Sequence, residues 1–99
     1  MQTNLLLLDL DGTVRRCRSD PKAFINIPDD QEIIPDAAVA LERFASIGAV
    51  IAGCSNQAGV AAGYKTIGEC IDEQIITMRL APQIQAIFFS PDSDGARCF

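Results

Sequence analysis

Residues 5–14 read LLLLDLDGTV, and this stretch decides how the rest of the chain is interpreted. Its first four residues form an uninterrupted apolar run, which is typical of a strand buried on both faces of a parallel sheet. Asp9 and Asp11 follow at a spacing of two, so their side chains point to the same side of an extended chain. Asp11-Gly12 then indicates a turn. The stretch predicts a buried strand that delivers two carboxylates to one end of a sheet.

Two further apolar runs, AVIAGC and AIFF, also predict strands. An amphipathic segment before AVIAGC predicts a helix over residues 36–47, with Asp36 as its N-cap and Gly48 as its C-terminal stop. The three strands are expected near residues 4–9, 49–54 and 85–90. The order β-α-β-α-β is typical of an α/β fold with an open parallel sheet.

The second helix begins at a capping box, in which Thr66 and Glu69 have the spacing that satisfies each other's main-chain N–H groups. Pro82 ends this helix. Its apolar side chains recur on one face, which predicts an amphipathic helix. The residues on that face are Ile67, Ile71, Ile75 and Met78.

The chain has 99 residues, which corresponds to a single domain over residues 1–99. Residues 14–35 are charged and contain three prolines, so they are expected to form a long irregular insertion, and such insertions are often functional. Residues 58–65 are small and Gly-rich, which favours a loop with at most one helical turn.

The composition restricts the class of protein. A hydrophobic content of 48% is typical of a globular domain, and a net charge of −5 argues against non-specific binding to nucleic acid or to anionic membranes. Neither a signal peptide nor an apolar run of about 20 residues is recognisable. The four cysteines are scattered, without a CxxC pair, and they are interpreted as reduced thiols of a cytoplasmic protein.

The polar residues after the first two strands predict a phosphate site. Ser55 and Asn56 follow the second strand, and ligands of open α/β sheets bind outside the carboxyl ends of the strands. Two carboxylates and a phosphate repel one another, so a hard cation, Mg²⁺, is expected among them. Asp9 is then placed to attack phosphorus, while the Ser55 hydroxyl and main-chain N–H groups hold the phosphoryl oxygens. Asp11 is placed to protonate the leaving alkoxide and then to activate water.

These motifs resemble those of the haloacid dehalogenase (HAD) superfamily. DLDGTV resembles its motif I, and CSNQAGVAAG resembles its motif II in the form SNQxGxxxG. The chain is similar to the subgroup of D,D-heptose bisphosphate phosphatase, histidinol-phosphatase and polynucleotide 3′-phosphatase, and FINIPDDQEIIPDAAVALERF also resembles that subgroup. The resemblance implies a three-layer Rossmann-like sheet. Only part of this sheet is expected here, since the chain looks C-terminally truncated.

The resemblance also implies a role for individual residues. Asp9 would be nucleophile and Mg²⁺ ligand, and Asp11 would be general acid/base and metal ligand, through its side chain and its backbone carbonyl. Thr13 would support the motif I loop at the phosphate site, and Ser55 and Asn56 would bind the phosphate. Contacts with the rest of the substrate are assigned to Gln57, Arg15 and Arg16, although a solvated charged loop explains the two arginines equally well.

The sequence departs from the family pattern in two places. Ser90 and Asp92 stand where related phosphatases carry a cysteine and a histidine of a zinc loop, so zinc is not expected. The motif III lysine and the motif IV acidic residues are not recognisable, because neither Lys22 nor Lys65 has the expected position. The family strand order 5-4-1-2-3 reduces to 3-2-1, with residues 5–8 at an apolar edge. Both helices should then cover one face, and the other face favours self-association or a partner.

Three functions remain open at this stage. The first is a Mg²⁺-dependent phosphomonoester hydrolase for a small phosphorylated metabolite or sugar phosphate, with a polynucleotide end less favoured by the acidic charge. The second is a truncated or degenerate HAD domain that acts as a binding module without catalysis. The third is a receiver-like α/β domain phosphorylated on an aspartate. Whether the chain itself is an enzyme therefore stays undecided.

Overall fold

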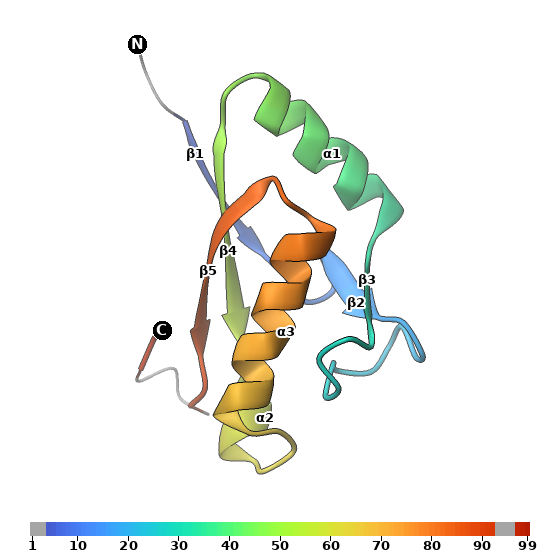
Figure 1. The fold of residues 1–99 in the computed structure, drawn as a ribbon, viewed down its shortest axis with the longest axis vertical. Coiled ribbons are helices and arrows are strands. Elements are labelled where there is room, and N and C mark those ends of the chain that lie inside the picture. Colours follow the sequence, from blue (N-terminus) through green and yellow to red (C-terminus); the bar gives the residue numbers. More distant parts are fainter. Residues whose placement is uncertain (1–3, 93–96) are drawn as a thin grey trace.

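Three parallel strands form the main sheet in the computed structural model, which describes residues 4–92 and 97–99 (Figure 1). The strands are β1 (Leu5–Asp9), β4 (Val50–Asn56) and β5 (Ile84–Ser90), in the order β1-β4-β5. The helices α1 (Pro35–Ser46), α2 (Ala58–Ala61) and α3 (Ile67–Leu80) lie between them in the sequence. The α/β class, the three strands and the position of β1 at one edge are therefore confirmed.

The strand register sets the polar ends of β1 and β4 side by side. Leu8 lies opposite Gly53 and Asp9 opposite Cys54, so Ser55 and Asn56 extend just past the end of β1. Gly53 permits the close approach of the chain after β1, because a Cβ atom at this position would lie 2.7 Å from Cδ2 of Leu10. The fit of Leu10 against Gly53 thus fixes where the motif I loop leaves the sheet.

The hydrophobic core lies on one face of the sheet, where both long helices pack. It joins strand residues to Leu41 of α1 and to Ala81 at the end of α3, as the sequence-based expectation of a single covered face requires. The buried members are Leu10, Val14, Leu41, Ile51, Ala81 and Ile84. On the opposite face, Leu5, Leu7 and Phe88 are exposed, which follows from the alternation of side chains along β1 and β5.

The insertion of residues 14–35 is more regular than expected. It contains a small antiparallel sheet of β2 (Arg15–Cys17) and β3 (Gln31–Ile33). This sheet arises because the chain reverses directly after Leu10, whose carbonyl accepts the main-chain N–H groups of Thr13, Val14 and Arg15. The prediction of an irregular segment was therefore wrong at the two ends of the insertion, which pair with each other as β2 and β3.

The expected start of α1 is also corrected. Its N-cap is Ile34, Pro35 is the first helical residue and Asp36 lies in the first turn. Proline suits this position because its fixed φ angle matches the helix and its missing N–H is not needed there. The expected stop is confirmed by Gly48, which has a φ of 85° directly after the helix.

Helix α3 begins as predicted, and Met78 of its apolar face packs against the core, but the other three residues of that face are exposed. Thr66 Oγ1 accepts the N–H of Glu69 at 3.1 Å, and the Glu69 carboxylate accepts the N–H of Thr66 at 2.9 Å. The apolar residues Ile67, Ile71 and Ile75 remain 39–44% exposed. The buried residues of the helix are instead Cys70, Glu73, Gln74 and Thr77. Among the described residues, no helix has the length and apolar character needed to cross a membrane.

Candidate active site

The motif I loop presents Asp9 to solvent. Gly12 adopts a φ of 81°, a conformation that costs a side-chain-bearing residue energy, and the N–H of Gly12 donates to the carbonyl of Arg15 at 2.9 Å. This tight turn brings Thr13 back towards the strand, where its hydroxyl donates to Asp9 Oδ2 at 3.2 Å. Asp9 is thus an exposed carboxylate at the end of β1, oriented by one hydroxyl group.

Asp11 is held more firmly than Asp9. Its Oδ1 accepts a hydrogen bond from Arg15 Nε at 3.1 Å, and its Oδ2 accepts one from the Ser55 hydroxyl at 2.6 Å. The side chain of Asp11 keeps 28% of its surface exposed, so it still reaches solvent. Ser55 itself is buried, and its oxygen also accepts a hydrogen bond from Gln57 Nε2 at 2.5 Å. The structure therefore uses Ser55 to connect Asp11 with the end of β4.

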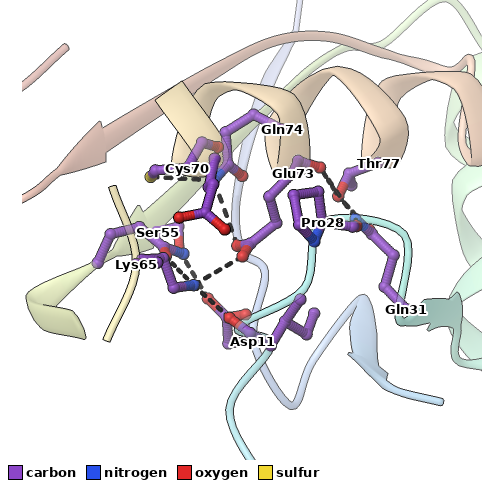
Figure 2. A network of polar contacts seen from close by, with 12 residues as sticks. Asp11, Pro28, Gln31, Ser55, Lys65, Cys70, Glu73, Gln74 and Thr77 are labelled. Atoms are coloured by element: carbon purple, nitrogen blue, oxygen red, sulfur yellow. Dashed lines mark hydrogen bonds and ion pairs between the residues drawn. The ribbon is translucent and has the colours of Figure 1, made fainter. Parts of the chain in front are cut away.

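The guanidinium of Arg15 is completely buried beneath this pair and is bound by α3. Its Nη2 lies 2.8 Å from Glu73 Oε2, and its Nη1 donates to Gln74 Oε1 at 2.8 Å and to Thr77 Oγ1 at 2.7 Å. A buried guanidinium needs both a counter-charge and acceptors for its N–H groups, and α3 supplies them. This need explains why the polar face of α3 is the buried one. Figure 2 shows Glu73, Gln74 and Thr77 of α3 as members of this polar network.

Lys65 is a site residue that the sequence-based assignment missed. It is buried, and its ammonium donates to Glu73 Oε1 at 2.7 Å, to Gln57 Oε1 at 2.9 Å and to the carbonyl of Ile25. Lys65 thereby joins the insertion, the end of β4 and α3 (Figure 2). No local pattern marked it, because its partners are scattered along the chain. The only available signal was a lysine placed directly before the capping box.

A cavity of about 760 Å³ opens beside Asp9. One wall comes from residues 23–26 of the insertion, and the other comes from residues 56–65. Its polar lining comes from Asp9, Asp11, Asn26, Asn56, Gln57 and Lys65. Asn56 is exposed there, whereas Ser55 does not line the cavity.

The two arginines assigned to substrate contacts are not among the described residues that line this cavity. Arg15 uses its N–H groups on buried protein atoms, which places it as a support of Asp11. Arg16 pairs with Glu32 across the small β2-β3 sheet at 3.5 Å. Both line a smaller hollow of about 160 Å³, which shares Asp11, Ala23, Phe24 and Ile25 with the cavity beside Asp9.

The donor set fits one hard cation. In the described part of the chain, no group of three or more His, Cys, Asp or Glu residues could hold a metal. Asp9 has an exposed carboxylate, and Mg²⁺ is commonly held by one or two protein carboxylates together with substrate phosphate and water. Asp9 and the Asp11 carbonyl suit such an ion, whereas the Asp11 carboxylate is already bonded to Arg15 and Ser55. Residues 93–96 of the zinc-loop stretch lie outside the described residues.

Cys70 and Cys54 lie near the site on α3 and β4. Burial raises the pKa of the Cys70 thiol, which therefore stays protonated and packs as a small side chain below Gln74. Cys54 is half-buried at the end of β4.

The parallel sheet, the carboxylate pair after its first strand and the Ser-Asn-Gln run after its second define an α/β domain of HAD-like fold. Two solved structures resemble it. The D,D-heptose 1,7-bisphosphate phosphatase of B. bronchiseptica, crystallised with magnesium and phosphate, matches with a TM-score of 0.78 and 27% identity over 97% of this chain. That of Burkholderia thailandensis matches with a TM-score of 0.63 and 20% identity over 87% of this chain, which concerns the fold alone.

The chain spans about half the length of these structures, 55% of the first and 51% of the second. No family model matches the chain, and no curated protein sequence does so either. The comparisons therefore support the HAD-like fold, and they leave the subgroup within it open.

Proposed function

We propose that this chain carries the nucleophile end of a Mg²⁺-dependent phosphomonoester hydrolase. The observation that carries the proposal is the exposed Asp9 carboxylate, which lines a cavity together with Asn56 while Asp11 is held two residues away. A magnesium- and phosphate-bound structural neighbour supports the same chemistry.

The proposed reaction has two displacements. An oxygen of the Asp9 carboxylate attacks phosphorus, the bond from phosphorus to the leaving oxygen breaks, and protonated Asp11 transfers its proton to that oxygen. In the second step a water molecule attacks the aspartyl-phosphate, Asp11 takes up its proton, and inorganic phosphate and the Asp9 carboxylate are regenerated. Bound Mg²⁺ would supply neutralisation of the phosphate charge, so that an anionic nucleophile can approach.

The residues around Asp9 are assigned to orient the nucleophile, to bind the phosphate and to orient the acid/base residue. Thr13 orients Asp9 through its hydroxyl hydrogen bond. Asn56 is exposed in the cavity and is assigned to the phosphoryl oxygens. The sequence analysis assigned Ser55 to the phosphate. Because its hydroxyl donates a hydrogen bond to Asp11, Ser55 is instead assigned to orient the acid/base residue. Gln57 donates a hydrogen bond to Ser55, and Lys65 donates one to Gln57, so both residues hold Ser55 in place.

The test is phosphate release from a panel of phosphomonoesters, with Mg²⁺ and with a chelator. The wild-type chain should release phosphate only with the metal, and Asp9→Asn should be inactive because the amide is no nucleophile. Asp36→Asn, which changes an exposed aspartate in the first turn of α1, is the matched control and should keep full activity. Equal release by the wild type and Asp9→Asn would contradict the proposal.

A second candidate is a HAD-like binding module without turnover. It is favoured by the exposed apolar residues of the sheet face opposite the core. Calorimetric binding of Mg²⁺ and phosphate without phosphate release from any ester would support this second candidate over the first.

A further inference from the structure

The cavity beside Asp9 has a composition that points to one kind of substrate. Its volume of about 760 Å³ is that of a small-molecule site, far larger than a phosphate group requires. The walls beyond the two carboxylates are largely apolar, with Ala23, Ile25, Ala58 and Ala62 among their residues. The leaving group of a substrate would therefore lie against apolar surface.

Two aromatic residues from different segments of the chain line this cavity. Phe24 belongs to the insertion, and Tyr64 belongs to the segment between α2 and α3. They are 83% and 74% exposed, although aromatic side chains of this size are normally well buried. Exposed aromatic residues that line a cavity mark a binding surface, and their faces favour flat, aromatic ligands.

The described lining of the cavity offers no free cation to bind a second phosphate group. Lys65 is the sole cationic residue in the described lining, and its three N–H donors are taken by Ile25, Gln57 and Glu73. Arg15 is buried and engaged with Glu73, and Arg16, which lines the adjoining hollow, is paired with Glu32. The described lining otherwise carries the negative charges of Asp9 and Asp11, which repel a second anion.

From these observations we infer that the site selects a phosphomonoester whose leaving group is aromatic, held between Phe24 and Tyr64, and discriminates against bisphosphates. This specificity rests on the proposed function, because the single phosphate is placed at Asp9. It differs from the bisphosphate named for the two structural neighbours.

The experiment is isothermal titration calorimetry of the full chain in Mg²⁺, with ligands that cannot be hydrolysed. The probes are inorganic phosphate, methylphosphonate, phenylphosphonate and a methylene bisphosphonate. We expect phenylphosphonate to bind about tenfold more tightly than methylphosphonate, because aromatic contacts add to the burial of the ring. Phe24→Ala and Tyr64→Ala should each remove most of this advantage and leave the affinity for phosphate unchanged.

The matched control is Ile27→Ala, an exposed apolar residue of the same insertion that does not line the cavity. It should retain the preference for the phenyl group. If phosphate binds but phenylphosphonate gains nothing over methylphosphonate, or the bisphosphonate binds more tightly than both, the inferred specificity is overturned and the proposed function stands. If no probe binds with Mg²⁺, the proposed function fails and the specificity fails with it.

Discussion

Arg15 Nη2 and Glu73 Oε2 form an ion pair of 2.8 Å in which both side chains are almost completely buried. Glu73 is also the counter-charge of Lys65, whose ammonium lies 2.7 Å from its other oxygen. One carboxylate on α3 thus neutralises two buried cations that come from the insertion and from the start of α3. Arg15 also contacts Asp11, so the network connects the acid/base residue to the core side of the sheet.

Glu73→Gln should destabilise the protein severely. The amide keeps the size of the side chain but removes the carboxylate that pairs with buried Lys65 and leaves buried Arg15 with Asp11. Breaking a buried pair typically costs about 3–5 kcal/mol. Urea denaturation followed by circular dichroism measures the change. Asp72→Asn, one residue earlier and exposed, is the control and should stay within about 0.5 kcal/mol of the wild type. A loss below about 1 kcal/mol for Glu73→Gln would show that the pair is dispensable.

Arg15→Lys should impair turnover more than it impairs substrate binding. Lysine retains the charge but cannot reproduce the guanidinium contacts with Asp11, Glu73 and Thr77. A misplaced Asp11 should lower kcat by about 10²-fold with little change in KM and should shift the pH profile of kcat. A variant that is merely less folded would keep the wild-type pH profile, and this outcome would contradict a positioning role. Arg16→Lys is the control, because Arg16 pairs with Glu32 alone.

Gly53→Ala should destabilise the sheet through a steric clash. The new methyl group would lie 2.7 Å from Cδ2 of Leu10, which is buried in the core, and overpacking of this kind costs about 1–3 kcal/mol. Gly68→Ala is the matched control, since its Cβ would meet Thr66 Oγ1 at an ordinary 3.8 Å. Alanine in the exposed first turn of α3 should leave stability unchanged or raise it by up to about 1 kcal/mol. Equal effects of the two substitutions on the denaturation midpoint would refute the predicted clash.

The capping box should make stability depend on pH in the acid range. The main-chain N–H of Thr66, followed by its side chain, lowers the pKa of Glu69 below the ordinary value of 4.5. A carboxyl group with a lowered folded-state pKa stabilises the fold above its unfolded value of about 4.5, and this contribution is lost as pH falls through the folded-state pKa. The difference in Tm between wild type and Glu69→Gln should therefore be present at neutral pH and vanish in acid. Glu42→Gln, an exposed change on α1, should show no such trend.

The uncovered sheet face should drive self-association. Leu5, Leu7 and Phe88 are exposed on that face, and an apolar surface at the edge strand β1 favours contact with a second molecule. Light scattering over a range of protein concentrations should show a rising mass for the wild type. The double substitution Leu7→Gln and Phe88→Gln should reduce it towards the monomer mass. Ile27→Gln removes an exposed apolar group from the insertion instead and should not, and an equal reduction by this control would contradict a specific face.

The sequence by itself determined the sheet and the place of the site. The apolar runs, the DLDGT turn and the capping box are local patterns, so strands and helix starts could be predicted to within a few residues. The convergence of Asp9, Asp11 and Ser55 also followed, because the carboxyl ends of parallel strands meet at one edge of a sheet.

Only the tertiary structure decided what lies beneath that edge. Ile67, Ile71 and Ile75 lie on the predicted apolar face of α3, yet they are exposed. The helix buries Glu73 and Thr77 instead. The reason is the guanidinium of Arg15, which must find counter-charge and acceptors once it is enclosed, and these partners lie 58 to 62 residues away. Helical periodicity counts apolar residues within one segment. This periodicity carries no information about a buried charge that another segment of the chain places against the helix.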